Sequence, residues 1–84
     1  MKLKELQDLT DSKSYSGLSD EAKEVISLIL EYYDEQDLTD ELIPAGEIDD
    51  ALEDESKNIA FWNGEINDYA DIQEEIYNAV DREN

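Results

Sequence analysis

The sequence predicts an all-α protein, a small single domain of three or four helices over residues 1–84. Three observations lead to this prediction. Apolar residues recur three or four positions apart over long stretches, which is the spacing of one face of an α-helix. The chain has only one Pro and three Gly, so few residues interrupt helices. Its 84 residues are enough for one domain and not for two.

Two elements are expected at the N-terminal end. Residues 2–9 contain leucines at every third position, which predicts a short helix. Residues 10–17 are polar and rich in Ser, which predicts a loop. Ser19 then has the side chain of a good N-cap, and two acidic residues follow it in the first turn, where the helix dipole favours negative charge.

The helix that starts after Ser19 is expected to end near Gln36. Leu28 and Tyr32 should widen its apolar face, which predicts that it is the most buried helix. The centre of that face is the stripe of Ala22, Val25, Ile26, Ile29, Leu30 and Tyr33. Thr39 is expected to cap one further short turn of helix, which Pro44 and Gly46 interrupt.

A third long helix is predicted between Glu47 and Trp62, ending at Asn63-Gly64, where Gly can adopt a left-handed backbone. Its expected apolar face is Ile48, Leu52, Ile59 and Trp62. An alternative takes Asn63-Gly64 as the turn of a β-hairpin in an α+β fold. The helix is favoured, because apolar alternation continues on neither side of the turn.

The last helix is expected to begin at a cap formed by Asn67 or Asp68. Residues at helical spacing predict its apolar face. They are Tyr69, Ile72, Ile76 and Val80.

Charge is the most informative property of the composition. The chain has 25 acidic and six basic residues, a net charge of −19, and from Glu24 onward it has 20 acidic residues and only two basic ones, Lys57 and Arg82. Such a chain repels nucleic acid and anionic lipid, and is steered toward basic protein surfaces. We therefore expect no direct nucleic-acid binding and no membrane binding. The alternative is that the acidic excess serves only solubility.

Catalysis is not expected. The chain has no His and no Cys, which removes the commonest general base, the thiol nucleophile and the thiolate metal site. It has no Gly-rich phosphate loop and no segment with the acidic spacing of an EF-hand. We expect a binding protein without cofactor or metal. No apolar run could span a membrane or form a signal peptide, so a cytoplasmic location is expected.

Rows of carboxylates on the predicted helices could imitate the phosphates of a nucleic acid. Side chains at i and i+4 of a helix lie about 5–6 Å apart, close to the spacing of successive phosphates on a strand. The alternative for each row is a solvated helix face. The candidate rows are Glu47, Asp50 and Asp54 on one helix, and Asp68, Asp71 and Glu75 on the last.

The C-terminal third carries a family resemblance. The pattern is Phe61-x-Asn63-Gly64-x₄-Tyr69-x-Asp71-x₂-Glu74, with Ala60, Asp68 and, after a one-residue slip, Tyr77-Asn78 also matching. This stretch resembles, without gaps, part of a small acidic phage anti-CRISPR family that inhibits the single-effector, RNA-guided CRISPR nuclease. It covers about 18 of the 84 residues. An acidic residue follows the matched Asp in that family where Ile72 stands here, and the family's central β-strands have no counterpart.

The resemblance implies a role for Tyr69 and Asp71, because their counterparts sit where the nuclease reads its PAM. PAM-reading arginines bind guanine edges in a bidentate manner, and a carboxylate satisfies the same fork. Tyr69 could instead be a core aromatic residue. The expected partner-binding residues are Asn63, Glu65, Asp68, Tyr69, Asp71, Glu74 and Glu75, and the secondary acidic face is Glu47, Asp50 and Asp54.

Two hypotheses about function follow. The first is an acidic DNA mimic of the anti-CRISPR type that occupies the basic nucleic-acid groove of a CRISPR nuclease or another host defence enzyme. The second is an immunity or antitoxin-type protein that neutralises one toxin. A charged protein-interaction module without an inhibitory role is the third possibility. Competition with nucleic acid separates the first two, because only a mimic must occupy the nucleic-acid site.

Overall fold

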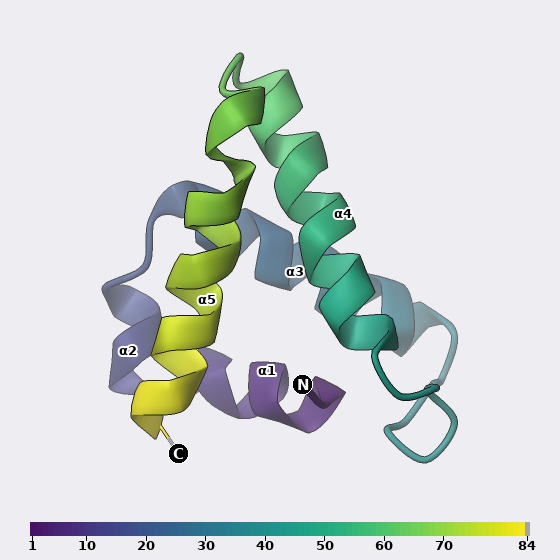
Figure 1. Cartoon of the computed structure of the whole chain (residues 1–84). Coiled ribbons are helices and arrows are strands. Elements are labelled where there is room, and N and C mark those ends of the chain that lie inside the picture. The colour runs from purple at the N-terminus through teal and green to yellow at the C-terminus, as the bar shows by residue number, and fades with distance from the viewer. Residues whose placement is uncertain (84) are drawn as a thin grey trace.

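The computed structural model describes residues 1–83 and confirms the all-α prediction. No β-strand occurs in these residues, so the hairpin alternative is wrong. Four helices have eight residues or more, and a short helix and a 3-10 turn accompany them (Figure 1). In chain order the elements are α1 (Leu3–Thr10), α2 (Lys13–Ser16), α3 (Asp20–Glu35), α4 (Glu47–Trp62), η1 (Ile66–Asp68) and α5 (Tyr69–Glu83).

The three long helices form the body of the molecule. α4 and α5 make an antiparallel hairpin that closes at the top of Figure 1, and α3 lies behind them. α1 lies across the open end of this hairpin, and α2 lies beside the lower half of α5. All four longer helices contribute side chains to one hydrophobic core. The Cα trace measures 35 × 25 × 19 Å.

α1 forms because its three leucines, Leu3, Leu6 and Leu9, are all buried, as the spacing predicts. Its N-terminus is held from a distance. The carboxylate of Asp40 accepts hydrogen bonds from the backbone N–H of Leu3 at 2.6 Å and of Lys4 at 3.1 Å. These N–H groups have no partner inside the helix, so Asp40 ties the turn before α4 to the start of α1.

The loop predicted over residues 10–17 is partly wrong, because Lys13–Ser16 form the short helix α2. Tyr15 explains the difference, since its ring packs partly buried against the core. The ammonium group of Lys23 also lies 5.6 Å from the centre of that ring. The local sequence is polar, and only this tertiary contact gives the segment an apolar side to bury.

α3 begins as predicted, with the Ser19 hydroxyl accepting a hydrogen bond from the Ala22 N–H at 3.2 Å. The prediction that Leu28 and Tyr32 widen the buried face is wrong, because they are 39% and 55% exposed. At 3.6 residues per turn, both lie roughly a quarter to a third of a turn from the centre of that face. The residues that are buried are Ala22, Val25, Ile26, Ile29 and Tyr33.

In the segment between α3 and α4, residues 39–43 form a hydrogen-bonded turn where a short helical turn is predicted. The carbonyl of Thr39 accepts from the N–H groups of Leu42 and Ile43. Gly46 then has φ +85°, a left-handed backbone that glycine adopts without steric cost. This residue directs the chain into α4.

α4 has the predicted bounds, but its apolar face ends earlier than expected. Ile48, Leu52, Ile59 and Ala60 are buried, whereas Trp62 is 80% exposed. The periodicity gives the direction of a side chain and not whether another element covers it. Trp62 is the last residue of α4 and is left uncovered.

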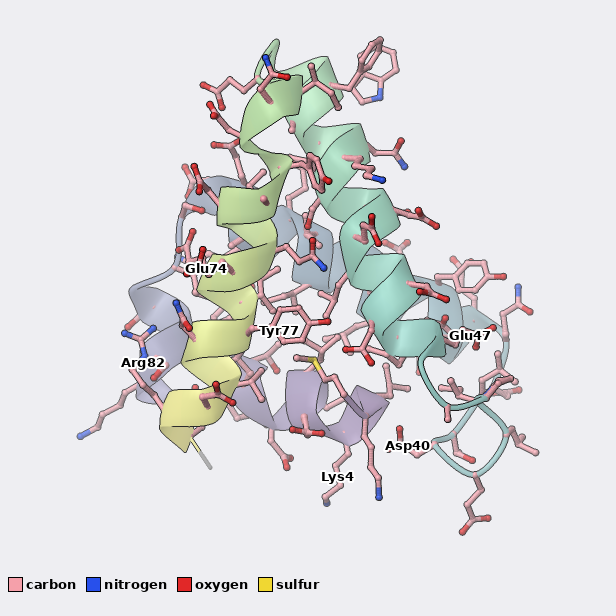
Figure 2. All side chains as sticks on the ribbon, in the orientation of Figure 1. Lys4, Asp40, Glu47, Glu74, Tyr77 and Arg82 are labelled. Atoms are coloured by element: carbon pink, nitrogen blue, oxygen red, sulfur yellow. The ribbon has the colours of Figure 1, made fainter. Side chains whose placement is uncertain are left out.

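α5 follows a 3-10 turn, Ile66–Asp68, where a cap at Asn67 or Asp68 is predicted. Ile72, Ile76 and Val80 are buried as predicted. One polar cluster ties α5 to α4. The Tyr77 hydroxyl donates to Asp49 Oδ1 at 2.5 Å, and Asp49 Oδ2 lies 2.9 Å from the N-terminal ammonium of Met1. In Figure 2, Tyr77 lies between the two helices.

Candidate partner-binding site

The tip of the α4–α5 hairpin positions the predicted site. Two backbone hydrogen bonds close the end of α4, from Gly64 N–H to Phe61 O at 3.1 Å and from Glu65 N–H to Ala60 O at 2.7 Å. This is the Schellman arrangement, in which the residue after the C-cap has a left-handed backbone. Gly64 fills that position with φ +75°. The Asn63-Gly64 pair therefore reverses the chain so that α5 returns along α4.

Four of the predicted carboxylates, Glu65, Asp68, Asp71 and Glu74, are exposed. Neither of the two ion pairs found within residues 1–83 includes any of them. In Figure 2, Glu74 lies on the side of α5 that faces away from α4. These side chains are therefore open to an external cation.

Two other predicted residues are engaged within the molecule. Glu75 accepts two hydrogen bonds from Ser19, from its N–H at 2.7 Å and from its hydroxyl at 2.8 Å. Asn63 donates from its side-chain amide to Glu21 at 3.1 Å. Both contacts fasten the start of α3 to the α4–α5 hairpin. Glu75 and Asn63 thus position the site's helices, and a partner would have to replace these bonds to use them.

Like charges meet at the tip. The carboxylate of Glu21 lies close enough to raise the pKa of Glu65 above its ordinary value, and Asp68 contributes in the same direction. Removing a charge here, by a proton or by a bound cation, relieves the repulsion. The electrostatics of the tip therefore favour a cationic partner group.

Tyr69 lies half-buried against the core at the start of α5. The ammonium of Lys57 lies 5.1 Å from the centre of its ring, and Lys57 also pairs with Glu53 at 3.0 Å. Tyr69 therefore combines a packing role with one side that is still accessible. Lys57 is the single basic residue of α4.

The secondary acidic face lies along α4, and its three members have different surroundings. Asp50 and Asp54 are exposed, whereas Glu47 is half-buried. Burial raises the pKa of the Tyr33 hydroxyl, and the neighbouring carboxylate of Glu47, which accepts its hydrogen bond, raises it further. Glu47 thus has a contact within the fold, and the row open to a partner is Asp50 and Asp54.

The sequence reasoning missed an exposed apolar patch at the hairpin tip. We call Phe61, Trp62 and Ile66 the tip patch; their side chains are 64%, 80% and 44% exposed. The rings of Phe61 and Trp62 pack edge to face, with centroids 5.9 Å apart. Adjacent aromatics at a helix end, followed by Asn-Gly, could have signalled it, because the chain reverses directly after them and leaves little of the fold to cover two large rings that point in different directions.

No group of three or more Asp, Glu, His or Cys side chains within residues 1–83 is arranged to hold a metal ion. None of the helices described in that range has the length and apolar character of a membrane-spanning segment. Comparison with protein-family models, with curated proteins and with solved structures finds no match.

Proposed function

We propose that this protein is an acidic DNA mimic that inhibits a partner by occupying the partner's basic nucleic-acid groove. The linear density of its charge carries the proposal. The net charge is −19 and the longest Cα extent is 35 Å, and dividing the second by the first gives about 1.8 Å per charge. Duplex DNA carries one negative charge per about 1.7 Å of its axis. A groove built for DNA meets a similar charge over a similar length.

Two exposed sets of carboxylates support this proposal. One lies on α5 and the turn before it, and the other is Asp50 and Asp54 on α4. Arginine and lysine side chains that bind phosphates also bind carboxylates, and an arginine fork can do so through two parallel hydrogen bonds. Such bonds give the mimic a defined position in the groove in addition to a general attraction.

The resemblance of the C-terminal third narrows the proposal to an RNA-guided nuclease of the single-effector type. Asp71 would then face a PAM-reading arginine, and Tyr69 would lie beside it. The exposed position of Asp71 at the start of α5 is compatible with that role.

The test is competition. The protein is titrated against such a nuclease loaded with guide RNA, with and without a DNA duplex that carries the PAM. A mimic must exclude the DNA, and its affinity must fall steeply between low and physiological salt, because the interaction is ionic. Simultaneous binding of DNA and protein would overturn the mimicry. No binding to nucleases of this type would overturn the narrower assignment.

Asp71→Ala tests the predicted contact directly. Removing one partner of a buried charge pair costs about 2–5 kcal/mol of binding, which is roughly a thirtyfold to several-thousandfold loss of affinity. Asp81→Ala is the matched control, because it makes the same charge change at an exposed position near the other end of α5. Equal small losses from both variants would mean that only total charge matters. Circular dichroism confirms that both variants fold.

The tip patch favours a second candidate, an immunity or antitoxin-type protein. An exposed Trp62 beside Phe61 is typical of the aromatic anchors that dominate protein–protein affinity, and phosphate mimicry does not require it. In this case Trp62→Ala should weaken target binding by about thirtyfold or more, and nucleic acid should not compete. The two candidates therefore differ in which variant, Asp71→Ala or Trp62→Ala, abolishes binding.

A further inference from the structure

A groove between the second half of α3 and the first half of α4 has features that the proposed function does not use. Its volume is about 450 Å³. Leu28, Tyr32 and Ala51 provide its apolar surface, and Leu28 and Tyr32 are two of the few large apolar side chains that stay exposed. α3 passes behind the lower half of α4 in Figure 1, and that half of α4 is its N-terminal half. Exposed apolar surface in a groove usually marks a binding site.

Tyr32, at one end of the apolar row of the groove, packs on a buried residue of its own helix. Tyr32 packs edge to face on the buried ring of Tyr33, with ring centroids 5.1 Å apart. Leu28 precedes Tyr32 by four residues on α3, so the two side chains lie about 5–6 Å apart along the helix. A row of this spacing matches apolar residues at i and i+4 of another helix lying beside it.

The rim of the groove is acidic on both sides. Glu31 and Glu35 line it from α3, and Asp54 and Glu55 line it from α4. No basic residue lines it, and neither ion pair in the described part of the chain involves a rim carboxylate. An occupant must therefore be apolar along its centre and positively charged along both edges.

We infer that this groove docks a basic amphipathic helix of a partner protein. The apolar residues of that helix contact Leu28 and Tyr32, and its Lys or Arg side chains pair with the carboxylates on the two rims. A second copy of this chain does not fit, because two surfaces of the same strong negative charge repel each other. The inference does not depend on nucleic-acid mimicry, because the ligand is different and the groove shares only Asp54 with the carboxylates that support that proposal.

The groove lies away from the hairpin tip. Ala51 in the groove and Trp62 at the tip are 11 residues apart on α4, which is about 16 Å at 1.5 Å per residue. Trp62 is the one tryptophan of the chain. The wavelength of its emission therefore responds to contact at the tip, and it is followed with the same peptide without its label.

The probe is a synthetic, fluorescently labelled peptide with Leu at every third or fourth position and Lys between them. Its controls are a peptide of the same composition with the leucines scattered around the helix, and oligolysine of equal length. The amphipathic peptide should bind at least about tenfold more tightly than either control, and Trp62 emission should not change. Equal affinity for all three peptides, or a shift in Trp62 emission, would overturn the inference.

Matched variants locate the binding. Leu28→Ala and Tyr32→Ala, made singly, should each weaken the amphipathic peptide several-fold, whereas Leu42→Ala should not, because Leu42 is 64% exposed and lies outside the groove. Glu35→Gln on the rim should weaken it more than Glu74→Gln on α5. If the groove variants and their controls, Leu42→Ala and Glu74→Gln, weakened the peptide equally, the binding would be a nonspecific attraction to an acidic protein. Failure here leaves the nucleic-acid competition result unaffected, so the two proposals are tested separately.

Discussion

Ser56 lies fully buried on the inner face of α4, and its hydroxyl has no hydrogen-bond partner among the described residues. A buried polar group without a partner costs about 1–3 kcal/mol in mutational studies. Ser56→Ala removes that group and is expected to stabilise the fold by about 1 kcal/mol, which raises the Tm of a domain of this size by about 4–8 °C. Thermal melts followed by circular dichroism measure the change.

The control for Ser56→Ala is Ser27→Ala, in the middle of α3, where the serine is exposed. Both changes replace Ser by the better helix former Ala, a gain of about 0.5 kcal/mol. Only Ser56→Ala also relieves a buried hydroxyl. Equal increases in Tm would contradict the assignment of a burial cost to Ser56.

Asp49 and Tyr77 form the second polar feature that the core must accommodate. Burial raises the pKa of Tyr77, and the hydrogen bond to the Asp49 carboxylate adds to this, bringing it to about 12. For Asp49, burial acts to raise the pKa, but the hydrogen bonds from Tyr77 and the N-terminal ammonium outweigh it and hold the pKa below its ordinary value. The hydrogen bond between Tyr77 and Asp49 therefore stabilises the fold most when the phenol is neutral and the carboxylate is charged.

This pair predicts a loss of stability in alkali. The phenol ionises near pH 10 in the unfolded chain and at about 12 in the folded protein, so the folded state holds more protons in between. The free energy of unfolding should therefore fall as pH rises from about 10 to about 12. Tyr77→Phe should reduce that fall and remove the highest step of an ultraviolet tyrosinate titration. A step that persists near pH 12 in the variant would contradict the assignment.

At the scale of the elements, the sequence predicts the long helices well because their signals are local. The Ser19 cap, the bounds of α4 and the Asn63-Gly64 stop all follow from neighbouring residues. The predictions that were wrong concern residues whose environment is set by contacts between distant segments. α2 exists because Tyr15 packs on the core, and Trp62 is exposed because no element covers the end of α4.

The glycines at two helix ends predict opposite outcomes for the same substitution. Gly64 has φ +75° and open space where a Cβ would lie, whereas Gly17 has φ −88° and room for a Cβ in ordinary van der Waals contact. A left-handed backbone costs an L-residue about 1–2 kcal/mol, and alanine returns about 0.4–1 kcal/mol by restricting the unfolded chain. Gly64→Ala should therefore destabilise by about 1 kcal/mol, and Gly17→Ala should be neutral or stabilising. Urea denaturation measures both, and a loss at Gly17 equal to that at Gly64 would contradict the argument.

At the scale of the whole molecule, the candidate site was only partly predictable. The total charge and the acidic rows are visible in the sequence, because exposed carboxylates need no specific contacts. The involvement of Glu75 with Ser19 and of Asn63 with Glu21 is not visible, since these partners lie 56 and 42 residues away. The α3–α4 groove was missed for the same reason. Leu28 and Tyr32 lie at the edge of the apolar face of α3, and the packing of α3 on α4 decides whether side chains at that edge are covered.

The net charge of −19 also governs the stability of the whole fold. The chain has 25 acidic and six basic residues, so most carboxylates have no compensating cation within the protein, and their mutual repulsion opposes the compact state. Raising ionic strength from 0.01 to 0.15 M shortens the screening length from about 30 to about 8 Å. The repulsion among the carboxylates is then reduced, whereas the apolar contacts within the core are unaffected. The Tm should therefore rise with NaCl over this range.

Glu65→Gln makes the salt prediction specific to a site. Glu21 and Asp68 raise the pKa of Glu65, so removing its charge should raise the Tm at 0.01 M salt. The increase in Tm should be smaller at 0.15 M salt, because screening already weakens the repulsion there. Glu41→Gln, at an exposed position in the turn before α4, removes one charge away from this cluster and should have the smaller effect. Choline chloride in place of NaCl separates screening from sodium binding, because screening depends on ionic strength alone. A Tm that is flat or falls with salt would mean that the carboxylates are already compensated, and the charge density that carries the proposed mimicry would then not be available to a partner.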